Sequence, residues 1–185
     1  MSRLFSFAFF LLFTVSSYSQ SEIYELRVYE MEFSKPAHVL HDYFQKALIP
    51  GLNRQGINNV GAFEELGEAL PKKVYLLISY PSMQAHQETA DQLEKDAQYK
   101  LDAASYMTAP SDQIPFKRVE STFIRSTKGF PELVKPAEDS EVFELRIYES
   151  YNEDALRRKV KMFNDSEVDI FKEGGLNTVF FGSNI

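Results

Sequence analysis

The sequence predicts an α+β protein built on a ferredoxin-like βαββαβ unit that is duplicated along the chain. Strand and helix patterns alternate from residue 22 to residue 125 in the order strand, helix, strand, strand, helix, strand. The stretch 22–30 then returns almost unchanged as 141–149, 119 residues later. The register continues without a gap, since Gly56 corresponds to Gly175. A period this long indicates a duplicated domain rather than a short solenoid repeat.

The first predicted strand covers residues 22–30, where side chains of two kinds alternate. Tyr24, Leu26 and Val28 share one side of this strand, and the polar residues occupy the other. Period two with β-branched and aromatic residues is typical of a strand with one buried face. We expect the face of Tyr24, Leu26 and Val28 to lie against the helices.

A long helix is expected from Lys35 to Gly56, because apolar residues recur there at spacings of three and four. Ser34 can cap its start and Gly56 can end it. Pro50 lies inside the pattern and should kink the helix, because proline removes a backbone donor. The counterpart of Pro50 is Asp169, so the kink should belong to this half of the chain alone.

Four more elements complete the unit: strands at 57–65 and 73–80, a helix at 82–105 and a strand at 114–125. The run 73–80 is nearly continuous in apolar residues, which is typical of a central strand. Ser82 can cap the helix that follows. The inner face of that helix should carry Ala85, Ala90, Leu93, Ala97 and Leu101. Its solvated face should carry the ion pairs Asp91–Lys95 and Asp96–Lys100.

Residues 1–20 have the three parts of a cleaved secretory signal. Arg3 supplies the positive charge, residues 4–15 are apolar, and residues 16–20 are small and polar. The apolar stretch is too short to span a membrane, which takes roughly twenty residues. A buried N-terminal helix is the alternative. We expect an exported protein, periplasmic or secreted, without stable membrane insertion after the signal is cleaved.

After the first domain (21–125), residues 126–140 read as a linker rich in glycine, proline and acidic residues. The repeated unit then restarts, with elements expected at 141–149 (strand), 153–172 (helix) and 176–182 (strand). Residues 141–185 therefore form an incomplete second repeat, which buries little apolar surface and leaves strand edges unpaired. We expect this repeat to lean on the first domain or to be completed by a second molecule, and the chain to be a fragment or truncated gene product.

Composition excludes several classes of function. The chain has 20 basic and 27 acidic residues and a net charge of −7. This charge disfavours binding to nucleic acid and to anionic membrane surfaces, which both require a basic field. The sequence contains no cysteine, so disulfides and thiolate chemistry are excluded.

The chain resembles the NIPSNAP family over residues 22–185. The residues that carry the resemblance are the two openings Tyr24-Glu-Leu-Arg-Val-Tyr29 and Phe143-Glu-Leu-Arg-Ile-Tyr148, supported by 56–63, 74–80 and 175–179. The resemblance implies the dimeric α/β-barrel superfamily, in which two ferredoxin-like sheets pair and enclose a cavity. It implies a homo-oligomer or an intramolecular pseudo-dimer, and it brings no settled reaction. The export signal departs from the mitochondrial animal members of the family.

The candidate ligand-binding residues lie on the polar side of the repeated strand. In the first copy they are Glu25, Arg27 and Tyr29; the second copy has Glu144, Arg146 and Tyr148 at the same places. An arginine beside a carboxylate and a phenol can orient an anionic or carbonyl ligand. The same residues can instead form an in-strand pair that sets the register of the sheet. We expect both arginines on the sheet face away from the helices, each within reach of a glutamate.

No cofactor or metal is predicted. His38, His41 and His86 are the only histidines, and the second copy has Arg157 and Val160 at the positions of the first two. Solvated surface histidines are therefore the interpretation. No glycine-rich phosphate loop, nucleophile elbow or metal-ligand spacing occurs in the sequence.

Two functions follow. The first is a non-catalytic barrel protein that binds a small-molecule ligand or a partner. The second is a cofactor-free oxygenase or isomerase-like enzyme that uses the face of Glu25, Arg27 and Tyr29. A strongly shifted carboxylate in an enclosed cavity would favour the enzyme.

Overall fold

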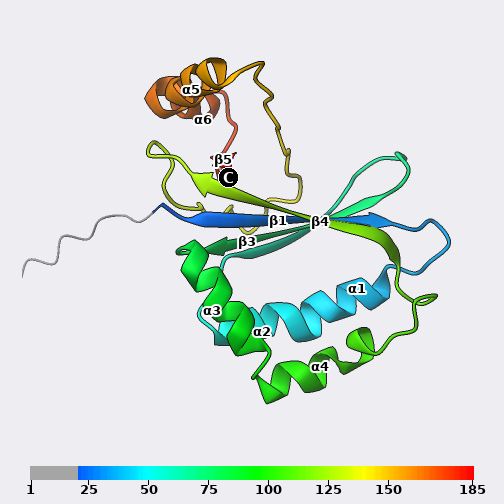
Figure 1. The fold of residues 1–185 in the computed structure, drawn as a ribbon. Coiled ribbons are helices and arrows are strands. Elements are labelled where there is room, and N and C mark those ends of the chain that lie inside the picture. Colours follow the sequence, from blue (N-terminus) through cyan, green and yellow to red (C-terminus); the bar gives the residue numbers. More distant parts are fainter. Residues whose placement is uncertain (1–20) are drawn as a thin grey trace, which may run out of the picture.

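A computed structural model describes residues 21–185, and the predicted export signal at 1–20 lies outside the described residues. Its centre is a five-stranded antiparallel sheet with the order β2-β3-β1-β4-β5 (Figure 1). The strands are β1 (Ile23–Met31), β2 (Val60–Glu64), β3 (Lys73–Tyr80), β4 (Phe116–Ser126) and β5 (Gly182–Asn184). The expected mixed α+β class is therefore confirmed, and β3 lies inside the sheet as its apolar run predicts.

One face of the sheet is covered by two helical connections (Figure 1). The first runs without interruption through α1 (His38–Tyr43), η1 (Phe44–Leu48) and α2 (Ile49–Arg54). The second consists of α3 (Met83–Leu93) and α4 (Ala97–Met107). The main core lies between these helices and the sheet, where apolar side chains from both layers are buried. Its members include Leu40, Phe44, Leu52, Leu76 and Ile78.

The prediction for the two faces of β1 is wrong. Tyr29 and Met31 belong to the core under the helices, whereas Tyr24 and Leu26 belong to a separate cluster on the open face. Glu25 and Arg27 alternate with Leu26, so they also face the helices. Period two identifies two faces but not which one the helices cover, and here both faces carry apolar residues. Arg27 therefore does not lie on the side away from the helices.

The expected helix 82–105 is two helices. Ser82 caps α3 as predicted, since its hydroxyl accepts a hydrogen bond from the Ala85 amide at 3.0 Å. The helix then ends at Leu93, and Asp96 caps the next helix, α4, by accepting a hydrogen bond from the Tyr99 amide at 3.0 Å. The predicted inner stripe is wrong at Ala90, Ala97 and Leu101, which are exposed. After the break the helical register changes, and the inward positions belong to Tyr99, Ala103 and Tyr106.

The helix α1–η1–α2 also departs from the prediction. Its N-cap is Ala37 without a side-chain bond, so Ser34 does not cap it. The five residues of η1 have π-helical hydrogen bonding, and Pro50 sits just after them at the start of α2. The same π-helical turn occurs 119 residues later, at η2 (Phe163–Glu167), where no proline follows. The irregularity therefore belongs to both halves of the chain. Gly56 ends the helix at φ +83°, as predicted.

On the other side of the sheet lies a second helix, formed by α5 (Glu153–Met162), η2 and α6 (Val168–Glu173) (Figure 1). It agrees with the helix expected at 153–172. The strand expected at 141–149 is absent, and Ile147 is 75% exposed. A strand needs a neighbour for its backbone groups, and this stretch has none among the described residues. The strand expected at 176–182 is wrong over 176–181, and β5 begins only at Gly182, where it pairs with the end of β4.

Candidate functional site

The buried carboxylate of Glu25 is the centre of a polar cluster between the sheet and the helices. Arg27 donates to both of its oxygens, from Nε at 2.7 Å and from Nη2 at 2.9 Å. The Ser121 hydroxyl donates to Oε1, and the Tyr80 hydroxyl donates to Oε2 at 3.4 Å. Nε2 of His86 lies 3.7 Å from Oε2. We call these five residues the Glu25 cluster.

The register of three strands brings the cluster together. On β1, Glu25 and Arg27 are two residues apart and therefore share a face. Arg27 lies opposite Ser121 of β4, and Tyr80 is the last residue of β3, opposite the start of β1. His86 comes from the first turn of α3, where its ring packs edge-on between Tyr80 and a phenylalanine of β4, Phe123.

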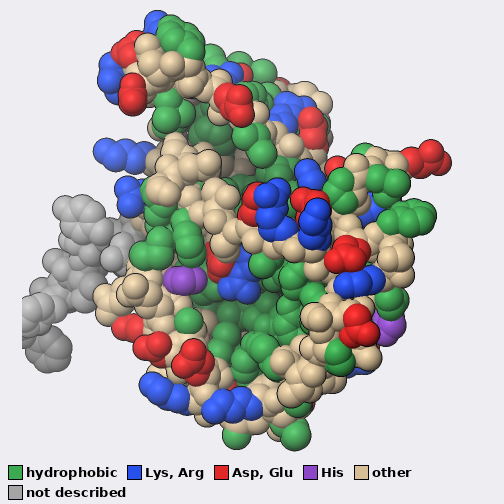
Figure 2. Space-filling view, turned by 45° about the vertical axis from the view of Figure 1, so that its right-hand side comes forward, with side chains coloured by type: hydrophobic (Ala, Val, Ile, Leu, Met, Phe, Trp, Pro, Cys, Tyr) green, Lys and Arg blue, Asp and Glu red, His purple; other side chains and the backbone are tan. Residues whose placement is uncertain are grey.

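The cluster is buried on one side and open on the other. The Glu25 side chain is 5% exposed, whereas those of Arg27 and His86 are 25% and 23% exposed. Figure 2 shows a hollow between the sheet and helices α3 and α4, with a hydrophobic floor and with acidic, basic and histidine side chains at one end. The guanidinium and the imidazole are therefore partly accessible to a small molecule, whereas the carboxylate is not.

The environment keeps Glu25 ionised. Burial alone would raise the pKa of its carboxyl, but the hydrogen bonds and charge of Arg27, the Ser121 hydroxyl and His86 outweigh burial and hold the pKa below 4.5. The paired carboxylate in turn raises the pKa of Arg27 above its ordinary value despite burial. The two groups are therefore a permanent ion pair at neutral pH, with donors of Arg27 left over.

A group of tyrosines continues the cluster beneath α1 and α4. The hydroxyls of Tyr43 and Tyr99 lie 2.8 Å apart, and the rings of Tyr43 and Tyr106 stack at 4.0 Å. Burial raises the pKa of Tyr43, of Tyr29 and of Tyr106, the last to about 12. These phenols are therefore neutral, and they offer rings and hydroxyls rather than charge.

The structure does not bring the second predicted set into this site. Arg146 does donate to Glu144, at 2.9 and 2.8 Å, so the expected arginine–glutamate pair forms in both halves. The second pair is largely exposed, and Tyr148 packs instead on Phe163 of its own half at 5.2 Å. Among residues 21–185, no hydrogen bond or ion pair joins the two sets.

The histidine prediction needs correction. His86 belongs to the Glu25 cluster, and His41 forms an ion pair with Glu64 at 2.7 Å, so neither is a merely solvated side chain. The position of His86 could have been found in the sequence, because it follows Tyr80 by a short turn and begins a helix capped by Ser82. Within residues 21–185, no group of three or more histidine and acidic side chains is placed to hold a metal ion.

Across residues 21–185, every helix falls short of the length and apolar content that a membrane span requires.

Comparison with solved structures finds NIPSNAP proteins at low identity. A NIPSNAP family protein from Agrobacterium tumefaciens is 18% identical, with a TM-score of 0.47, and the match covers 60% of this chain and 91% of that one. A NIPSNAP domain protein from Burkholderia xenovorans is 17% identical, with a TM-score of 0.41 and coverage of 65% and 99%. A search of curated proteins found no match.

The family comparison gives a direct result. The NIPSNAP family model matches residues 24–129 of the sequence, which is more than half of the chain. The matched stretch contains β1 to β4 and all the helices between them, and so the whole Glu25 cluster. It includes the first opening motif from which the resemblance was inferred. This chain belongs to the NIPSNAP family.

Proposed function

We propose that the chain is an exported, non-catalytic binding module, and that the Glu25 cluster binds a small molecule carrying a carboxylate or carbonyl group. The observation that carries the proposal is the state of Arg27. Two hydrogen bonds to Glu25 fix the orientation of its planar guanidinium, yet a quarter of the side chain stays exposed. A planar guanidinium with free donors is suited to an acceptor group of a ligand.

Tyr29 and His86 complete the proposed site. Tyr29 is neutral because burial raises the pKa of its phenol, and it lies on the same face of β1 as Arg27. Nδ1 of His86 is covered from solvent and has no hydrogen-bond partner within the described chain. A buried polar atom without a partner is costly, and a bound ligand can supply the partner. The proposal covers the first set of candidate residues and not the exposed second set.

Binding is favoured over acid–base catalysis by the charge of Glu25. A general base works best with a pKa near the working pH. The pKa of Glu25 is lowered instead, because Arg27 and the Ser121 hydroxyl stabilise the charged form more than burial opposes it. Glu25 is therefore a weak base, and its main effect is to orient Arg27.

We also propose that residues 141–185 are a partial copy of the first unit and act in place of a barrel partner, so that the protein is an intramolecular pseudo-dimer. Two contacts support this reading: Phe180 packs on Tyr24 of the open sheet face at 5.3 Å, and Phe143 packs on Phe63 at 5.0 Å. The π-helical turn and the positive-φ glycine that recur 119 residues apart support the copy.

Export is part of the proposal and rests on the signal pattern in residues 1–20. Its test is expression of the full chain with its own N-terminus, followed by mass spectrometry of the recovered protein. We expect a mature N-terminus near Ser19 or Gln20 in the exported fraction. An intact Met1 in the cytoplasm would refute export.

The binding proposal is tested by thermal unfolding with a panel of small carboxylates: benzoate, phenylacetate and hexanoate, each beside its neutral amide. A ligand present at about a hundredfold over its Kd adds about 2.7 kcal/mol to the free energy of unfolding. We expect at least one carboxylate to raise the unfolding temperature of the natural chain and Arg27→Met to abolish that rise.

Arg146→Met is the matched control, because it removes the same side chain from the same sequence motif outside the Glu25 cluster. It should keep the ligand response of the natural chain. The proposal fails if no member of the panel stabilises the protein at millimolar concentration, or if Arg27→Met and Arg146→Met respond alike.

A further inference from the structure

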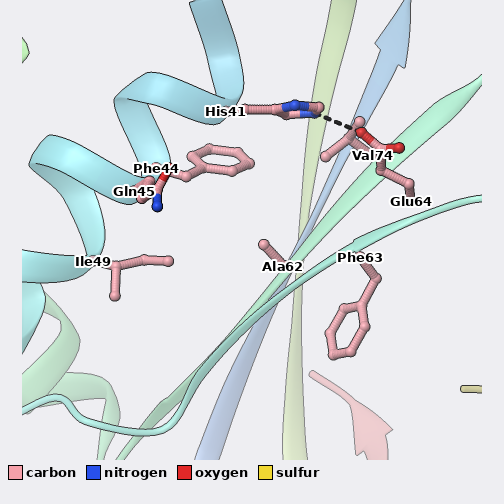
Figure 3. Close-up of a pocket in the computed structure, with 8 residues that line it drawn as sticks. All are labelled: His41, Phe44, Gln45, Ile49, Ala62, Phe63, Glu64 and Val74. Atoms are coloured by element: carbon pink, nitrogen blue, oxygen red, sulfur yellow. Dashed lines mark ion pairs between the residues drawn. The ribbon is translucent and has the colours of Figure 1, made fainter. Parts of the chain in front are cut away.

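A second hollow, separate from the Glu25 cluster, lies at the β2 edge of the sheet. It opens between the helix α1–η1–α2 and the edge strand β2, with a volume of about 300 Å³ (Figure 3). Phe44, Ile49, Ala62 and Val74 supply apolar side chains to its walls. An engineered apolar cavity of roughly 150 Å³ is enough to bind benzene. This pocket has room for a molecule of one or two rings.

The pocket exists because the edge strand carries a small residue where it faces the helix. Ala62 pairs with Leu76, a core residue on the helix side of the sheet, so Ala62 has the same orientation. Its methyl group does not reach the helix. Phe63, the next residue, is turned to the other face of the sheet, where it packs with the open-face cluster (Figure 3). The helical wall contains Phe44 and Gln45 of the π-helical turn, a local form that recurs at functional sites.

The mouth of the pocket is polar. His41 and Glu64 face each other across it, from the helix and from β2, with Nε2 and Oε1 2.7 Å apart (Figure 3). Nε2 of His41 is covered from solvent but lacks a well-directed hydrogen bond within the described chain. The mouth therefore holds a possible hydrogen-bond donor, His41, and an acceptor, Glu64, that can still form hydrogen bonds to a ligand.

We propose that this pocket binds a small aromatic alcohol or phenol, with its ring against Phe44, Ile49 and Val74 and its hydroxyl at the mouth. A hydroxyl can donate to the Glu64 carboxylate and accept from the imidazole of His41 at the same time. A ligand carboxylate would meet the like charge of Glu64. The pocket should therefore prefer a neutral hydroxyl compound, whereas the Glu25 cluster should prefer a carboxylate or carbonyl compound.

The probe for this proposal is 2-naphthol, with naphthalene as the comparison without a hydroxyl. The chain contains no tryptophan, so the emission of the probe can be followed without tryptophan background. We expect 2-naphthol to bind about threefold to tenfold more tightly than naphthalene, the ratio that one net hydrogen bond supplies.

Two variants place the probe. Ala62→Leu fills the space and should weaken 2-naphthol binding by at least about tenfold, because overpacking excludes the ring. Glu64→Ala removes an exposed side chain without disturbing the core, and it should reduce the preference for 2-naphthol over naphthalene to about onefold. Ala90→Leu makes the same change as Ala62→Leu on the exposed surface of α3, and it should leave binding unchanged.

The outcomes are separable. Loss of binding in Ala62→Leu together with loss of the hydroxyl preference in Glu64→Ala supports the site. Three results overturn it: no binding of 2-naphthol to the natural chain, binding that survives both variants, or binding that disappears in Arg27→Met, which would place the probe in the Glu25 cluster. If Ala62→Leu does not fold, the effect of Glu64→Ala on the preference decides.

Discussion

The arginine–glutamate pair that occurs once in each half of the chain should contribute differently to stability in the two halves. Arg27 and Arg146 each donate two hydrogen bonds to the glutamate two positions before them. The first pair is set among Tyr80, His86 and Ser121, whereas the second lies at the surface. Burial strengthens the attraction between two opposite charges, and it also raises the free-energy cost of removing one charge and leaving the other unpaired. The identical motif therefore predicts different consequences of mutation.

Glu25→Gln should destabilise the protein by about 3 kcal/mol at neutral pH, the low end for a broken buried pair, because it leaves the partly buried Arg27 without its counter-charge. Chemical denaturation of the full chain measures this difference. Glu144→Gln is the matched control and should leave the unfolding midpoint unchanged, since exposed pairs contribute little. Equal effects of the two substitutions would contradict the contrast between the two sites.

The pH dependence has a definite sign. Burial raises the pKa of the Glu25 carboxyl, but Arg27 lowers it by more, so the pKa in the folded protein is below its ordinary value of 4.5. As the pH falls, Glu25 is therefore protonated in the unfolded chain before it is protonated in the folded protein. The stabilising contribution of the pair is therefore complete above pH 4.5 and is lost as the pH falls below that value. Comparing the unfolding free energy of the natural chain and Glu25→Gln between pH 3 and 7 checks this, and the difference should shrink in acid.

At the scale of elements, two of the three predicted helix-terminus signals are confirmed, and the Ser34 cap is wrong. The Ser82 cap and the Gly56 terminus follow from short-range hydrogen bonding and backbone freedom, and the structure has both. Features that depend on neighbours were missed: the break between α3 and α4, the π-helical turns, and the missing strand at 141–149. Asp96 combines both kinds of contact: it caps α4 locally through the Tyr99 amide, and its other carboxylate oxygen pairs at 2.8 Å with Arg54 of another helix.

Asp96→Ala should lower the thermal unfolding midpoint, because it removes both the N-cap of α4 and the partner of Arg54. Asp91→Ala changes the same residue type one helix earlier. Within the described chain no ion pair of Asp91 is found, so this control should be close to neutral. An equal or larger loss from Asp91→Ala than from Asp96→Ala would contradict the special role of Asp96 as a cap and as the partner of Arg54.

At the scale of the whole molecule, the open face of the sheet is the feature that needs a partner. Tyr24, Leu26 and Leu77 form an apolar cluster there, and Leu133 and Phe180 pack on it from the later part of the chain. A sheet with two apolar faces requires cover on both sides. The helices cover one face, and residues beyond the first domain cover part of the other.

Phe180→Ala should expose this face and increase either the binding of a hydrophobic dye or self-association, measured by sedimentation. Phe171→Ala removes the same side chain from within the second helix, where it packs on Phe163 instead of the sheet, and it should show neither effect. If the two variants behave alike, Phe180 does not shield the sheet, and the intramolecular pseudo-dimer loses its main support.

The sequence by itself determined the order of elements in the first unit, the central place of β3, the family, and the pairing of each arginine with its glutamate. The family follows from the resemblance of the opening motif, and the other three follow from periodicity and spacing, which are local. Only the tertiary structure decided that Glu25, Arg27 and Tyr29 face the helices, because alternation identifies two faces without ranking them. It likewise decided that His86 and Ser121 join Glu25, since residues from three strands and a helix meet only when the sheet is assembled.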